Sequence, residues 1–167
     1  MDYQNLARQL VEGADVSVLL GGGGADLLPD SKGGRRTDGR DLILEMRNQG
    51  YDIVQNQAEL ESTPSWRTPK TLGLFSMGNM EFSDEFSATS TQPTLAVLVR
   101  NAIRLLQYNP RGYLLIVDAG LSGKAATQNE GERTLKEMLA LDEAVAAAVD
   151  SAGEKALVIV AGKRSVG

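Results

Sequence analysis

The side chains in this sequence that could carry out chemistry gather after one short apolar run. Residues 113–117 (YLLIV) have no polar break, and the next residue is Asp118. Ser122, Lys124 and Thr127 follow it and supply two hydroxyls and an amine. In open α/β sheets the functional groups lie beyond the carboxyl ends of the strands. If the apolar run forms a strand, the segment after it is therefore where we expect a site.

Composition excludes several kinds of site. The chain contains no histidine and no cysteine, so thiolate metal sites, disulfides and cysteine nucleophiles are excluded, and the commonest general base is absent. The net charge of −5 argues against nucleic acid as the main partner. No apolar run is long enough to span a bilayer, and residues 1–5 show no export signal. We therefore expect no membrane partner, and the compartment stays unknown.

Strand patterns alternate with helix patterns along the chain. Short apolar runs predict buried strands, and apolar residues at spacings of three and four predict amphipathic helices. The predicted strands are 16–20, 51–54, 71–75, 113–117 and 156–160, and the predicted helices are 3–11, 39–49, 56–60, 93–108 and 132–149, with a loop at 119–127. This alternation predicts an α/β fold with three αβα layers and a mainly parallel sheet. We expect one domain spanning residues 1–167.

Local signals mark the ends of several of these elements. Asp38 is predicted as the N-cap of the second helix and Gly50 as its stop, and Asn56 as the cap of the third. The glycine run 21–24 follows a strand but lacks the Lys-Ser/Thr ending of a phosphate-binding loop. We interpret this run as a tight turn with close backbone packing.

Seven short blocks of this sequence resemble alkaline phosphatases in their order and approximate spacing. The blocks are 15–23 (DVSVLLGGG), 37–42 (TDGRDL), 50–51 (GY), 72–75 (LGLF), 93–96 (PTLA), 109–113 (NPRGY) and 141–145 (LDEAV). The resemblance covers nearly all of this chain but only the middle and later part of such an enzyme. It implies a reduced alkaline-phosphatase-like domain.

The resembled family uses two zinc ions, a magnesium ion and a serine nucleophile. Its motif V-E-G-G-R-I-D-H-A-x-H corresponds to residues 117–127 here (VDAGLSGKAAT). The family's glutamate, aspartate and histidine ligands then become Asp118, Gly123 and Thr127. Only the first of these keeps a coordinating group.

A second ligand motif of the family, T-A-D-H, corresponds to residues 161–164. Its aspartate–histidine pair becomes Lys163 and Arg164, which cannot coordinate a cation. We expect the segment with the serine to precede residue 1 and a final histidine ligand to follow residue 167. Because a zinc site needs three or four donors in fixed geometry, Asp118 alone predicts no bound metal and no cofactor.

These substitutions predict a non-catalytic binding or structural module rather than an enzyme. Lys124, Lys163 and Arg164 predict a site for a phosphate-like anion, with salt bridges or an ordinary solvated surface as the alternative. We expect Asp118 to lie within reach of one of these cations. A reduced sheet also exposes edge strands, which predicts a homo-oligomer or a partner chain that covers them.

Two other functions stay open at this point. One is a phosphomonoester hydrolase with altered chemistry, in which Ser122, Thr127, Ser165 and Asp118 supply hydroxyls and an acid, and Lys124 or Lys163 acts as a base. The other is one part of a split enzyme that a second polypeptide completes.

Overall fold

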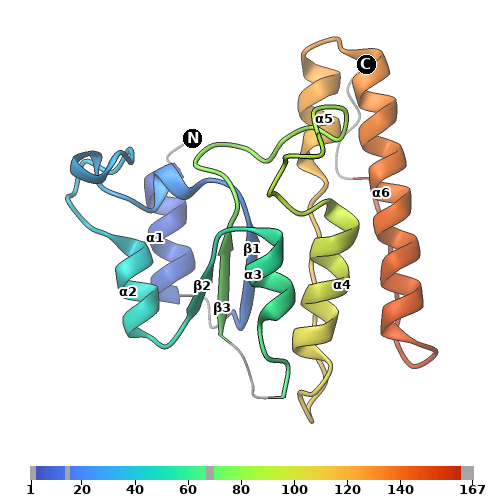
Figure 1. The fold of residues 1–167 in the computed structure, drawn as a ribbon, viewed down its shortest axis with the longest axis horizontal. Helices are drawn as coiled ribbons and strands as arrows, with labels where there is room; N and C mark the ends of the chain where they lie inside the picture. The colour runs from blue at the N-terminus through green and yellow to red at the C-terminus, as the bar shows by residue number, and fades with distance from the viewer. Residues whose placement is uncertain (1–2, 14–15, 67–69, 163–167) are drawn as a thin grey trace. The chain divides into compact units, whose positions relative to one another are not determined.

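The computed structural model describes residues 3–13, 16–66 and 70–162. The chain divides into two compact units, an N-terminal unit (1–80) and a C-terminal unit (81–167). Figure 1 shows the helices and strands of both. The prediction of a single domain over 1–167 stays a prediction.

The N-terminal unit contains a three-stranded parallel sheet. Its strands are β1 (Val18–Gly21), β2 (Asp52–Val54) and β3 (Thr71–Leu74), arranged in the order β1-β3-β2. Both neighbours run parallel to β3, so its backbone forms hydrogen bonds along both edges. The predicted α/β fold with a parallel sheet is confirmed in this unit.

Two helices pack against this sheet through an apolar core. Helix α1 spans Tyr3–Gly13 and helix α2 spans Leu42–Asn48. The buried core residues are Val11, Leu27, Leu42, Met46, Tyr51 and Leu72. Short 3-10 turns at Gly24–Asp26 and Asp30–Lys32 connect β1 to α2, and α3 (Gln57–Ser62) connects β2 to β3.

The glycine run after β1 makes the close backbone approach that the sequence predicts. The N–H of Gly23 donates to the carbonyl oxygen of Gly78 at 2.6 Å. A Cβ atom at Gly22 would collide with that same oxygen. Gly23 has a φ of +84°, which side chains other than glycine rarely adopt. The run is therefore a packed turn.

Helix α2 begins later than predicted, and its N-cap is a different aspartate. The carboxylate of Asp41 accepts the N–H of Leu44 at 2.9 Å. Asp38, the predicted cap, instead binds the buried guanidinium of Arg36. The prediction at Asp38 is wrong because two aspartates precede the helix and a distant contact selects between them. The predicted cap at Asn56 is confirmed, since its side chain accepts the N–H of Glu59.

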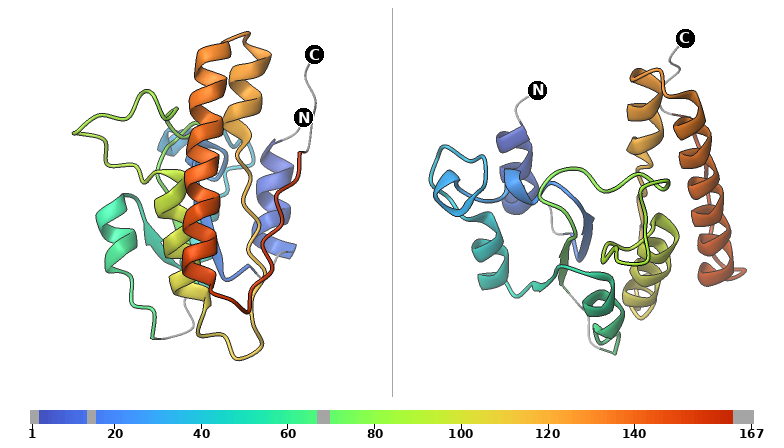
Figure 2. Two further views of the ribbon diagram at one scale, coloured as in Figure 1. Left: turned by 90° about the vertical axis from the view of Figure 1, so that its right-hand side faces the viewer. Right: turned by 45° about the horizontal axis from the view of Figure 1, so that its top comes forward.

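The described residues of the C-terminal unit, 81–162, form three helices. Helices α4 (Leu95–Leu106) and α5 (Gly120–Thr127) both pack on the long helix α6 (Gly131–Ala152), at different levels along it (Figure 2). The core between α4 and α6 consists of Ala96, Val99, Ile103, Ala144 and Ala147. Small alanines let the two helices approach closely. The predicted loop at 119–127 is wrong over most of its length, because residues from 120 onward form α5.

Two predicted strands of the C-terminal unit are not strands in the structure. Residues 113–117 and 156–160 form neither a strand nor a helix. The outward side chains of Leu114 and Ile116 are 82% and 81% exposed, and that of Leu157 is 85% exposed. The sequence predicted that both faces of these segments would be buried. In the described part of this unit, no strand lies beside them to form ladder hydrogen bonds.

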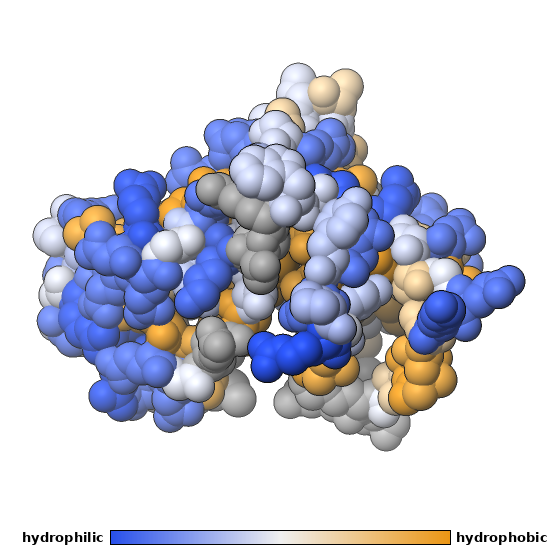
Figure 3. Space-filling view, turned by 90° about the horizontal axis from the view of Figure 1, so that it is seen from below, coloured by the Kyte–Doolittle hydropathy of each residue, from blue (hydrophilic) through white to orange (hydrophobic). Residues whose placement is uncertain are grey.

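Apolar side chains therefore reach the surface in places, as the face in Figure 3 shows. The expectation that a second copy or a partner chain covers such segments stays a prediction. In the described residues, every helix is too short or too polar to cross a bilayer.

The capping contact yields a test of α2. Asp41→Ala should destabilise the chain by about 1 kcal/mol, because the N–H of Leu44 loses its acceptor. Asp41→Asn should cost much less, since asparagine caps equally well and loses only the ion pair to Lys32, whose side chain is 57% exposed. Urea unfolding followed by circular dichroism measures both. Equal losses in the two variants would show that charge, rather than capping, is the stabilising feature.

Candidate functional site

Asp118 lies at the junction that the sequence analysis singled out. It follows the apolar segment 113–117 and precedes the first residue of α5, Gly120, by two positions. Its side chain is exposed. Helix α5 is anchored by Ala125, which is fully buried. The chain thus presents one carboxylate at the entrance to a short anchored helix.

The hydroxyls of α5 are engaged with the helix backbone. Ser122 Oγ donates to the carbonyl oxygen of Ala119 at 2.9 Å, and Thr127 Oγ1 donates to that of Lys124 at 2.8 Å. Gly123, the position compared with the family's aspartate ligand, has no side chain. Because both hydroxyls donate to backbone carbonyls, neither is activated as a nucleophile. The hydroxyl of Thr127 is also a weak ligand for a metal cation.

Lys124 is held against an aromatic ring. Its Nζ lies 5.2 Å from the centroid of Phe82, and the guanidinium carbon of Arg133 lies 4.5 Å from the same centroid. Phe82 itself is buried. Two cations on one ring are each attracted by its π electrons, so this contact ties α5, α6 and the segment around residue 82 together.

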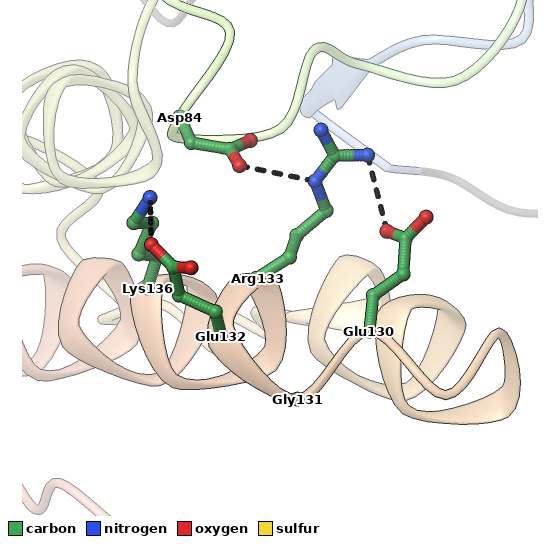
Figure 4. A pocket seen from close by; sticks show the side chains of 6 residues that line it. All are labelled: Asp84, Glu130, Gly131, Glu132, Arg133 and Lys136. Atoms are coloured by element: carbon green, nitrogen blue, oxygen red, sulfur yellow. Dashed lines mark hydrogen bonds and ion pairs between the residues drawn. The ribbon is translucent and has the colours of Figure 1, made fainter.

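Arg133 is the centre of a charged pocket near the start of α6, which the sequence analysis missed. Its guanidinium lies 3.1 Å from Asp84, 3.2 Å from Glu85 and 3.1 Å from Glu130. Figure 4 shows Arg133 between Asp84 and Glu130. Hydrogen bonding to Asp84 raises the pKa of Arg133 above its ordinary value. The acids clustered at residues 84–85 and 130–132 are the only sign of this pocket in the sequence. The sequence does not show that both clusters bind the same arginine.

The other charged pairs of this pocket are local to α6. Lys136 binds Glu132 at 2.8 Å, which lowers the pKa of the glutamate and raises that of the lysine. The buried Glu137 accepts the N–H of Ser83 at 2.6 Å. The pocket has a volume of about 310 Å³ and is lined by the acids Asp84, Glu130 and Glu132 and the bases Arg133 and Lys136, so its walls carry a small net negative charge that does not favour an anion.

The donors do not fit the metal ions of the resembled family. The chain has no imidazole or thiolate, and the described residues contain no group of three Asp or Glu side chains that could hold a metal ion. Asp118 is the one carboxylate among the matched ligand positions. Lys163 and Arg164 lie outside the described residues, so the anion site predicted with Lys124 and the pairing of Asp118 with these cations stay predictions.

The pocket around Arg133 yields a test of its role. Arg133→Ala should lower the melting temperature more than Lys136→Ala, because Arg133 contacts three carboxylates and stacks on Phe82, whereas Lys136 has one partner that is itself 83% exposed. The melting temperature of Arg133→Lys should lie between those of the two alanine variants, since lysine keeps the charge but lacks the planar guanidinium that forms paired hydrogen bonds. Thermal unfolding measures all three. A larger loss in Lys136→Ala would contradict the assignment.

The donor set also predicts the metal content. After incubation with zinc and dialysis, the chain should retain less than one zinc ion, since Asp118 cannot supply a tetrahedral site alone. Elemental analysis measures the ratio, and Asp118→Ala should leave it unchanged. One or more retained zinc ions per chain would show that the positions were matched wrongly.

Comparison with known proteins identifies relatives along most of the chain. The membrane-bound alkaline phosphatase of Bombyx mori is 36% identical over 93% of this chain and 31% of that protein. The tissue-nonspecific alkaline phosphatase of Gallus gallus is 32% identical over 85% of this chain and 30% of that protein. The chain spans about 30% of the length of these curated relatives.

Solved structures agree with these sequence relatives. The alkaline phosphatase of Thermus thermophilus matches with a TM-score of 0.70 at 31% identity, covering 84% of this chain and 28% of that chain. The cold-active enzyme of Shewanella sp. matches with a TM-score of 0.71 at 24% identity, covering 87% of this chain and 32% of that chain, which supports the fold.

These relatives correct one prediction. The sequence analysis predicted that the chain is not an enzyme, yet its relatives at 28–36% identity are alkaline phosphatases, which are enzymes. Nothing in the described residues shows that the chain is inactive. The substituted ligand positions limit metal binding, and they do not by themselves exclude catalysis. The prediction is therefore overturned.

The family assignment itself rests on the whole chain. The family model for alkaline phosphatase matches residues 2–166, which includes both compact units. The resemblance inferred from seven collinear blocks is thereby confirmed. The chain belongs to the alkaline phosphatase family.

Proposed function

We propose that this protein hydrolyses phosphate monoesters, with the region around Asp118 and helix α5 taking part in the reaction. The observation that carries the proposal is the match to alkaline phosphatases over residues 2–166. TM-scores of 0.70 and 0.71 to solved members support the same fold. Because the chain spans about 30% of its curated relatives, the activity in their names comes to it as a proposal.

The reaction assigns Asp118 an acid–base role. Water adds to phosphorus, the P–O bond to the alcohol breaks, and inorganic phosphate and the alcohol are released. An exposed carboxylate at the start of α5 can accept the proton of the attacking water. Ser122 and Thr127 are poorer candidates for the nucleophile, because both hydroxyls donate to backbone carbonyls.

Side-chain cations take the electrostatic role in this proposal. Negative charge develops on the phosphoryl oxygens during hydrolysis, and fixed positive groups nearby lower the barrier. Lys124 is held in place by Phe82, and its ammonium can bind a phosphate oxygen without a metal. Lys163 and Arg164 belong to the same proposal on sequence grounds alone. Binding of the phosphate by side-chain cations instead of metal ions is the altered chemistry that the substituted ligand positions favour.

Hydrolysis of p-nitrophenyl phosphate by the purified chain tests the proposal. Asp118→Asn should lower kcat/KM by about 10²–10⁴, as expected for loss of a general base. Lys124→Ala should mainly raise KM, because it removes a contact to the phosphate. Asp142→Asn, which changes an exposed acid on α6, is the matched control and should leave the rate unchanged.

Two outcomes would contradict the proposal. One is turnover no higher than that of buffer with the same metal ions. The other is turnover that is equal in the native chain and in Asp118→Asn, which would assign the activity to a contaminant or to another group.

A further inference from the structure

We propose that the N-terminal unit carries a separate anion site, an arginine-lined pocket that takes a phosphate group. The pocket has a volume of about 450 Å³ and lies between helix α1 and the loop that precedes α2. Its lining residues are Gln4, Asn5, Arg8, Arg36, Asp38 and Arg40. It is independent of Asp118 and Lys124, which belong to the C-terminal unit.

Arg36 forms the fixed floor of this pocket. Its side chain is 1% exposed, and its Nη1 donates to the carbonyl oxygens of Gln4 at 3.1 Å and Asp26 at 3.2 Å. Its Nε and Nη2 bind the carboxylate of Asp38. Because these contacts come from three separate segments, the guanidinium cannot rotate away when a ligand enters.

Arg40 is a second arginine held in one orientation. Its Nε and Nη2 bind both carboxylate oxygens of Glu45, at 2.9 Å and 2.6 Å, and its Nη1 binds Glu12 at 2.6 Å. Hydrogen bonding to Glu45 raises the pKa of Arg40 well above its ordinary value, so it remains a cation. Each terminal nitrogen still carries one N–H that these contacts do not use.

Arg8 is the arginine of this pocket that has no direct acidic partner among the described residues. It lies on an exposed face of α1 and makes no hydrogen bond or ion pair with any residue that the structure describes. The acids around the pocket are already engaged, Asp38 by Arg36 and both Glu12 and Glu45 by Arg40. An anion in the pocket therefore meets one unpaired guanidinium and the spare N–H groups of a second.

This arrangement fits a phosphate group better than a single carboxylate. Guanidinium groups bind phosphate through pairs of parallel hydrogen bonds, and a phosphate has enough oxygens to contact two guanidiniums at once. The volume lies within the usual range for small-molecule pockets, about 300–1,000 Å³, so it leaves room for an organic group beyond the phosphate. The ligand class is accordingly inorganic phosphate or a small phosphate monoester.

Titration of the isotope-labelled chain with inorganic phosphate tests the proposal, with amide shifts read by NMR at constant ionic strength. We expect saturable shifts at residues 4–8 and 36–40 and a dissociation constant that Arg8→Ala weakens about tenfold or more. Arg47→Ala, which removes an exposed arginine of α2 outside the pocket, is the control and should bind normally. Arg8 is chosen over Arg36 because an exposed side chain can be removed without unfolding the unit.

Further measurements separate phosphate binding in this pocket from a general effect of salt and from binding in the C-terminal unit. Chloride at the same ionic strength should give no saturable shift, and Lys124→Ala should bind phosphate in this pocket as the native chain does. A non-hydrolysable phosphonate that binds more tightly than phosphate identifies a monoester as the ligand, and one that binds less tightly identifies phosphate itself. Absence of saturable shifts, equal shifts with chloride, or binding unaffected by Arg8→Ala would overturn the proposal.

Discussion

The parallel pairing of β3 with a strand on each side is the constraint on which the N-terminal unit depends. Leu72, at its middle, is fully buried and stands in register with Leu19 on β1 and Ile53 on β2. Because both edges of β3 are paired, its backbone polar groups are satisfied away from water, and its side chains can enter the core. Helices α1 and α2 then have an apolar surface against which Val11 and Met46 pack.

The C-terminal unit shows what happens to similar segments without such neighbours. Residues 113–117 are as apolar as β3, yet Leu114 and Ile116 remain largely exposed. The inward side chain of Leu115 does pack on the core of α4 and α6. Helix packing therefore covers one side of the segment, while ladder hydrogen bonds, which require another strand, decide whether it becomes part of a sheet.

Arginine side chains that bind carboxylates occur in both units. Arg36, Arg40 and Arg133 each bind carboxylates, so their charge is largely balanced and their orientation is fixed. Lys124 and Arg8 differ, since the first lies on an aromatic ring and the second has no acidic partner among the described residues. We propose that these two cations, one in each unit, each attract a phosphate oxygen.

The sequence by itself determined the features that depend on composition or on neighbours a few residues away. The absence of histidine and cysteine limits the possible metal chemistry however the chain folds. Helix α6 follows from its apolar spacing, and the cap at Asn56 from its contact with Glu59, three residues on. The seven collinear blocks identified the family for the same reason, because order along a chain needs no coordinates.

Only the tertiary structure decided the features that depend on distant partners. Asp41 rather than Asp38 caps α2 because Arg36, which also reaches back to the carbonyl of Gln4, takes the carboxylate of Asp38. The pocket around Arg133 joins it to Asp84, 49 residues earlier in the chain. Such contacts leave no local pattern, since their energy comes from segments that meet only after folding.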